Sequence, residues 1–304
     1  MPSTPFSPSI SIGYNSSYQN SLYNQVMLDL EEAPVLKKRP VSPVNSMYTW
    51  SKYSGIQPFW EFPKTGEYAS FLSLEIECEN VNYASNIIKK FDFLTSEEDN
   101  SLRLGGREFI NNIPLQLKDY HEKLPVLFEE LQKQQVQFSH RTSIHVHNNV
   151  LFKTRVELNL YVLMYFLVEP QLYAFAGRDR KYSNFCVPNS SLLRLFHGWE
   201  KFKSFPKYCG LSGCRFQDLG TLEWRHFPGT FDVKKLLQWL EMITLLDLYT
   251  NKIKLSSDKE YFKLEEYWLC NPNIAIEEIR KVFPYIEISE QDVAYNSLVY
   301  QGML

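Results

Sequence analysis

The sequence lacks the features that mark several large classes of protein. It has no run of about 20 apolar residues, the length that a membrane-spanning helix needs. The most apolar stretch, residues 156–168, is interrupted by Glu157 and Asn159 and predicts a buried core helix. The first residues show no charged segment followed by an apolar one, so no signal peptide is expected. The formal net charge is only −3, so composition favours neither nucleic acid nor a membrane as a partner.

Several motifs of catalysis and redox chemistry are also absent. The five cysteines are scattered and form no C-x-x-C motif, which is typical of a reduced, cytoplasmic protein. Cys186 and Cys209 lie in no nucleophile motif and are interpreted as small apolar residues. No Walker A, G-x-G-x-x-G or G-x-S-x-G motif occurs, so any nucleotide would bind without a P-loop.

Composition divides the chain in two. Residues 1–65 begin with a stretch rich in Ser, Asn, Pro and Tyr, which predicts a low-complexity, flexible arm, with docking of its aromatic residues as the alternative. Residues 66–304 have the apolar content of a folded domain, with the chemistry-bearing motifs in about 68–250 and further helices in 251–304. No internal repeat is found.

The compact part alternates predicted strands and helices. Strands are expected at 71–78, 93–96, 102–104, 107–110, 142–150 and within 215–227, with an acidic turn at 97–100. Helices are expected at 82–91, 116–136 with a break at Pro125, 155–175 ending or kinking near Pro170, 190–205, from Asp232 to 249, 274–282 and 290–299. This order predicts an α+β fold: an antiparallel or mixed sheet with helices on one face and an open face for a site.

The predicted strands carry polar side chains at alternating positions. The pairs are Glu75 and Glu77, His145 and His147, and Glu223 and Arg225, with Glu108 on a further strand. Residues i and i+2 of a strand point to the same side, so each pair presents two polar groups to one face. These residues predict a site for a metal and an anion. The simpler alternative is that the acids are solvated on the sheet surface and that Glu223 and Arg225 form an ion pair on their strand.

The residue types leave the metal open. Two neighbouring carboxylates repel unless a cation or a proton lies between them, and Mg²⁺ prefers such oxygen ligands. His145 and His147 with Glu108 would also suit Zn²⁺, so a zinc hydrolase is an alternative. The basic residues 177–182 are either an anion-binding loop or a solvated turn, and Arg107 should point away from Glu108.

The order of these motifs resembles the amidoligase family of ATP-dependent carboxylate–amine ligases, relatives of glutamine synthetase and glutamate–cysteine ligase. The resemblance rests on E-x-E at 75–77, D-x-S-L at 99–102, G-G-R-E-F at 105–109, H-V-H at 145–147, R-x-R at 178–180 and T-L-E-W-R-x-F-x-G-T-x-D at 221–232. It implies a glutamine synthetase-like catalytic domain, with an antiparallel sheet whose concave face carries the active site. It also implies a phage or bacterial source, and the host cytoplasm if the chain is phage-encoded.

The resemblance assigns roles to single residues. It implies that Glu75, Glu77, Glu108 and Glu223 bind Mg²⁺, or possibly Mn²⁺. His145 would lie near the metal and the γ-phosphate of ATP, and Arg178 and Arg180 would contact phosphate or substrate. Arg225 would bind phosphate or a substrate carboxylate, and Asp99 would lie near the substrate or the amine.

The implied activity is formation of an amide through an acyl phosphate. Its carboxylate and amine could be small molecules, peptides or protein side chains, and an oligomer is possible. Ser73 and Ser143 stand where the family usually has glycine. These departures and the N-terminal arm motivate a further alternative, a non-catalytic interaction protein on a decayed ligase fold.

Overall fold

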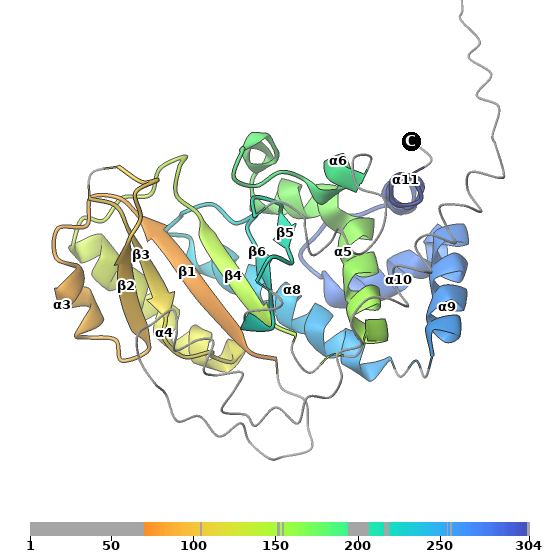
Figure 1. The fold of residues 1–304 in the computed structure, drawn as a ribbon, viewed down its shortest axis with the longest axis horizontal. Helices are drawn as coiled ribbons and strands as arrows, with labels where there is room; N and C mark the ends of the chain where they lie inside the picture. The colour runs from red at the N-terminus through yellow and green to blue at the C-terminus, as the bar shows by residue number, and fades with distance from the viewer. Residues whose placement is uncertain are drawn as a thin grey trace, which may run out of the picture.

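The structure, a computed structural model, describes residues 70–103, 105–150, 153, 155–193, 207–215, 219–253, 255 and 257–302. The expected N-terminal arm at 1–65 and most of the helix expected at 190–205 lie outside these residues. Within them the fold is α+β, as predicted, with some helices behind the sheet and a further group of helices beside it (Figure 1).

The central element of the described fold is one antiparallel sheet. Its strands are β1 (Leu72–Cys78), β2 (Leu94–Glu98), β3 (Arg107–Asn111), β4 (Ile144–Asn149), β5 (Leu211–Ser212) and β6 (Thr221–Trp224). Their spatial order is β2-β3-β1-β4-β6-β5, and each neighbouring pair is antiparallel. Strands distant in sequence, such as β1 and β4, therefore lie side by side.

The register of the sheet gathers the predicted polar residues on one face. Glu77 is opposite Glu108, Glu75 is opposite His145, and His147 is opposite Glu223. Directly opposed residues of antiparallel strands point to the same side of the sheet. The alternating pairs of four strands thus form one continuous polar face.

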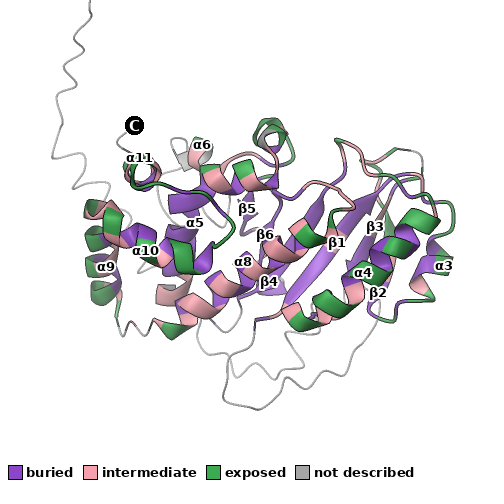
Figure 2. Cartoon of the chain, turned by 180° about the vertical axis from the view of Figure 1, so that it is seen from behind, coloured by how far each residue is buried: buried purple, intermediate pink, exposed green. Residues whose placement is uncertain are grey.

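The other face of the sheet is apolar and covered by helices. Leu74 and Ile76 of β1, Val146 of β4 and Trp224 of β6 are fully buried. Helices α4 (Leu117–Lys133) and α8 (Val233–Lys252) cross this face, as the view from behind shows (Figure 2). Each large apolar side chain buried there contributes about 1.5–3 kcal/mol to folding. This layer holds the polar face in place.

Helix α5 (Arg155–Ala176) is the expected core helix. All side chains from Leu160 to Val168 are buried, and the helix packs against α8, α9 (Asp258–Cys270) and α11 (Glu290–Tyr300). It continues past Pro170, where a proline removes one backbone hydrogen bond and crowds the preceding turn. The Asn296 side chain donates from Nδ2 to the carbonyl of Leu167 at 2.7 Å, which joins α11 to this part of α5.

The remaining helices are short or lie toward the C-terminus. They are α3 (Ala84–Ile88), the 3-10 helix η1 (Arg178–Tyr182), α6 (Asn189–Leu193), α9 (Asp258–Cys270), α10 (Pro272–Val282) and α11 (Glu290–Tyr300). Helix α9 was not expected from the sequence, whereas α10 and α11 were. In the described part of the chain, no helix has both the length and the apolarity to cross a membrane.

Three local predictions differ from the structure. Residues 102 and 103 form a bend and no strand, because Arg103 donates its backbone N–H to Glu79 Oε1 and not to a strand partner. Glu97 and Glu98 belong to β2, since both pair with β3, so the turn begins only at Asp99. Helix α4 runs unbroken through Pro125.

A buried ion pair fastens the end of β4 to α8. The Lys153 ammonium lies 2.8 Å from Asp247 Oδ1, and it donates to Thr250 Oγ1 at 2.7 Å and to Asn251 Oδ1 at 3.1 Å. Asn148 of β4 donates to the other carboxylate oxygen of Asp247 at 3.2 Å. Both charged side chains are excluded from solvent, so each depends on the other for compensation.

We predict that Lys153→Met lowers the free energy of unfolding by about 3–5 kcal/mol, because Asp247 would stay buried without its counter-charge. Urea unfolding followed by tryptophan fluorescence measures the change. Lys133→Met is the matched control, since Lys133 pairs with Glu129 on the exposed side of α4 and should leave stability unchanged. Equal stability of the two variants would contradict a structural role for the buried pair.

Candidate active site

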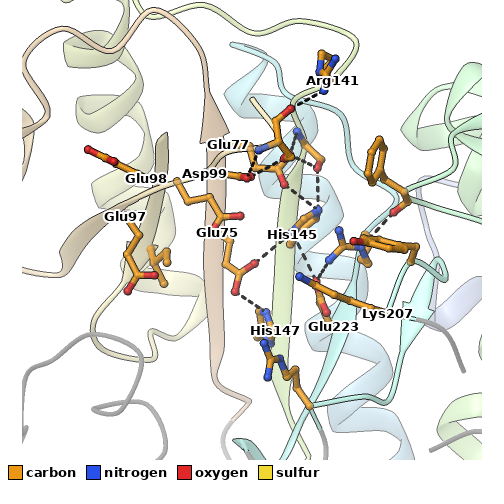
Figure 3. Close-up of a pocket in the computed structure, with 18 residues that line it drawn as sticks. Glu75, Glu77, Glu97, Glu98, Asp99, Arg141, His145, His147, Lys207 and Glu223 are labelled. Carbon is orange, nitrogen blue, oxygen red and sulfur yellow. Dashed lines mark hydrogen bonds and ion pairs between the residues drawn. The ribbon is translucent and has the colours of Figure 1, made fainter. Parts of the chain in front are cut away.

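A cavity of about 280 Å³ lies over the polar face of the sheet. Its floor comes from β1, β3, β4 and β6, and its side chains converge as Figure 3 shows. Of the predicted site residues, the cavity is lined by Glu75, Glu77, Asp99, Glu108, His145, His147, Glu223 and Arg225. The fold therefore brings together eight of the residues that the sequence singled out.

Glu75 lies at the centre, between the two imidazoles (Figure 3). Its Oε1 is 3.0 Å from His147 Nε2, and its Oε2 is 3.2 Å from His145 Nδ1. Burial favours the neutral acid, but the charge of His147 and the bonds to both histidines outweigh it and hold the pKa of Glu75 well below its usual value. Burial opposes a charge on His147 too, yet Glu75 beside it raises the pKa of His147.

Ser143 connects Glu77 to His145. Its backbone N–H and its hydroxyl both donate to Glu77 Oε2, at 2.7 Å and 2.5 Å, and its Oγ lies 2.8 Å from His145 Nε2. An ionised carboxylate only accepts, so the serine hydrogen points to Glu77 and the serine oxygen accepts from Nε2–H. The serine at this position is thus part of the site.

This arrangement fixes the orientation of His145. The Nδ1 of His145 lies 3.2 Å from Glu75 Oε2 and 3.6 Å from Glu223 Oε1. Two carboxylate oxygens that approach one ring nitrogen require a proton or a cation between them. The geometry therefore suits a bound cation at this point.

Three groups of side chains have ligand atoms within 4.8 Å of one another. They are Glu75, His147 and Glu223; Glu75, Glu108 and His145; and Glu77, Asp99 and Glu108. The last group offers only carboxylate oxygens, the ligands that Mg²⁺ prefers, whereas the other two add one imidazole nitrogen and also suit Mn²⁺ or Zn²⁺. The donor set fits a divalent cation.

The carboxylates of the site repel one another without such a cation. Burial, together with the charges of Glu75, Glu77 and Asp99, raises the pKa of Glu108 to about 9. The neutral form of Glu108 is therefore favoured when no metal is bound. A divalent cation would replace that proton, as metal ligation generally does.

Arg225 follows the end of β6 and reaches into the same cavity. Its Nη1 donates to Glu223 Oε1, and its Nε donates to the backbone carbonyl of Phe185 at 3.2 Å. The guanidinium lies 5.6 Å from the centre of the Tyr208 ring. An arginine held in this way beside carboxylates can pair with an anionic ligand.

Arg180 and Arg178 are placed differently. Arg180 is buried and does not line the cavity; its Nε donates to the carbonyl of His226 at 3.0 Å and its Nη2 to that of Arg225 at 2.8 Å. Arg180 therefore stabilises the backbone at Arg225 and His226, because its guanidinium donates to both of their carbonyls. Arg178 begins η1, but its side chain lies outside the described part of the structure.

Three basic residues of the cavity were not predicted from the sequence. Arg141, Lys207 and Arg215 line it together with Arg225. They lie in loops around the strands, and Arg141 donates to the carbonyl of Ser101 at 2.6 Å across the rim. No local sequence pattern distinguishes them from other surface cations, so only the fold reveals them.

In comparisons with known proteins, no protein-family model and no curated protein matches the chain. The site is therefore described by its geometry: carboxylates and imidazoles spaced closely enough to hold a metal ion, beside a group of cations.

We predict that Ser143→Ala weakens binding of Mn²⁺ by about tenfold to a hundredfold, the usual cost of losing a group that orients a metal ligand. Isothermal titration with Mn²⁺ measures this. Ser73→Ala is the matched control, because Ser73 lies opposite His147 on the same face but its buried hydroxyl makes no hydrogen bond. Equal affinities of the two variants would show that Ser143 does not orient the site.

Proposed function

We propose that the chain is an ATP- and Mg²⁺-dependent ligase that joins a carboxylate to an amine. One observation carries the proposal: carboxylates, imidazoles and Arg225 converge in a single cavity on one face of an antiparallel sheet. Such a site can hold a divalent cation and, next to it, a polyphosphate. The ordered motifs that resemble amidoligases support the same activity.

The proposed reaction has two steps. A substrate carboxylate attacks the γ-phosphorus of ATP, which gives an acyl phosphate and releases ADP. An amine then attacks the acyl carbon, so that an amide forms, phosphate leaves and the amine loses a proton. A bound divalent cation would screen the repulsion between the carboxylate and the triphosphate.

The residues of the chain have distinct tasks in this proposal. Glu75, Glu77, Glu108 and Glu223 would hold divalent cations, each in one or more of the three convergent groups, and His145 is oriented by Ser143 to share in that task. Arg225, with Lys207 beside it in the cavity, would neutralise the charge on the transferred phosphoryl group. Asp99, at the rim of the cavity, is available to an incoming ammonium group.

The alternatives are supported less well by the geometry. A zinc hydrolase built on His145, His147 and Glu108 needs those three to converge, yet none of the convergent groups among the described residues contains both histidines. The alternative of a decayed ligase was motivated in part by the serine at position 143, where the family usually has glycine. Ser143 hydrogen-bonds to both Glu77 and His145, so this serine contributes to the site.

We predict that ADP release requires a carboxylate and an amine together, and that Arg225→Met lowers its rate by about 10²–10³-fold, as expected when a group that stabilises developing charge is removed. A coupled ADP assay with pooled acids and amines, followed by mass spectrometry of the products, measures both effects. The activity should be lost with a chelator and restored by Mg²⁺ or Mn²⁺.

Arg280→Met is the matched control, since Arg280 lies on α10, donates to the carbonyl of Ile288 at 3.1 Å and does not line the cavity. It should leave the rate unchanged. Arg225→Lys, which retains the positive charge beside Glu223, tests the role if Arg225→Met does not fold. No ADP release with any acceptor pool, together with no binding of ATP, would refute the ligase.

A further inference from the structure

Two exposed aromatic side chains form one wall of the cavity. Among the described residues that line it, phenyl and phenol rings are present only at Phe185 and Tyr208. The side chains are 43% and 41% exposed, and the rings meet edge to face with their centres 5.4 Å apart. Large rings left open to water at a polar cavity are expected where a ligand covers them.

The backbone holds these two rings in place. The N–H of Val187 donates to the carbonyl of Tyr208 at 2.7 Å, and the N–H of Gly210 donates back to Val187 at 2.9 Å. The two segments are therefore paired as a short parallel bridge between Val187 and Cys209. The backbone that carries the wall is therefore paired before a ligand arrives, which reduces the cost of binding.

Cations lie directly beside this wall. Arg225 bonds to the carbonyl of Phe185 at 3.2 Å and lies 5.6 Å from the Tyr208 ring, and the Lys207 ammonium is 5.9 Å from the same ring. Arg225 also binds Glu223 of the carboxylate cluster. Across the cavity the order is thus metal-binding carboxylates, then cations, then aromatic rings.

We propose that Phe185 and Tyr208 receive the base of a nucleoside triphosphate whose phosphates lie against Arg225 and Lys207. A nucleotide matches the order of groups, because its phosphates bind metal and cations while its base is a planar ring that stacks on aromatic side chains. The inference rests on the proposed function and adds the place where the nucleotide is recognised. A protein partner on these rings would leave the adjoining cations and carboxylates without a role.

The test compares two ligands in the presence of Mg²⁺: a non-hydrolysable ATP analogue and inorganic tripolyphosphate, which has the phosphates without the base. Isothermal titration of the full chain gives both affinities. Phe185→Ala should weaken binding of the analogue by about tenfold to a hundredfold and leave binding of tripolyphosphate unchanged. Phe185→Trp should restore binding of the analogue, because it restores a stacking surface.

Tyr182→Ala is the matched control, since Tyr182 is a 76% exposed ring three residues away that does not line the cavity. Thermal melts establish that each variant is folded. Unchanged binding of the analogue by Phe185→Ala, or equal loss for both ligands, would overturn the base site while the ligase proposal stands. Failure of the wild-type chain to bind either ligand would overturn both.

Discussion

The contact of Glu75 with two imidazoles is the interaction on which the rest of the site depends. A carboxylate at this position would repel Glu77, Glu108 and Glu223 if it had no positive partner. His145 and His147 of the neighbouring strand supply that partner, at 3.2 Å and 3.0 Å. The pairing of β1 with β4 that places them there also positions Ser143 against Glu77. The register of β1 against β4 therefore organises two of the four predicted acidic ligands, Glu75 and Glu77.

Such a concentration of buried charge costs stability, and the opposite face of the sheet offsets the cost. Burying charged groups is favourable only when each one is paired and hydrogen-bonded. Behind the polar face, the strands contribute fully buried apolar side chains to a core shared with α4, α5 and α8. The strict alternation of apolar and acidic residues along β1 produces both faces of the sheet. Leu74 and Ile76 pack against the helices, while Glu75 and Glu77 point into the cavity.

Sequence reasoning succeeds where the physics is local and periodic. Alternation predicted β1, β3 and β4, and the i, i+2 rule predicted that Glu75 and Glu77 share a face. It could not predict that Glu75 opposes His145, because strand register depends on contacts between distant segments. Helix α9 was missed, and the bend at residues 102 and 103 was mistaken for a strand, since Arg103 is bound there by a distant carboxylate, Glu79.

The cations of the site illustrate a further limit of sequence reasoning. Arg178 and Arg180, which form a basic motif, were predicted to contact phosphate or substrate. Arg180 instead donates from its guanidinium to the carbonyls of Arg225 and His226. Lys207 and Arg215, which stand alone in sequence, line the cavity instead. The sheet supplies most of the groups proposed to bind metal, whereas loops supply most of the groups that would contact an anionic ligand. Because loops can change without disturbing the sheet, we expect ligand choice in this chain to depend on its loops and the chemistry to depend on its strands.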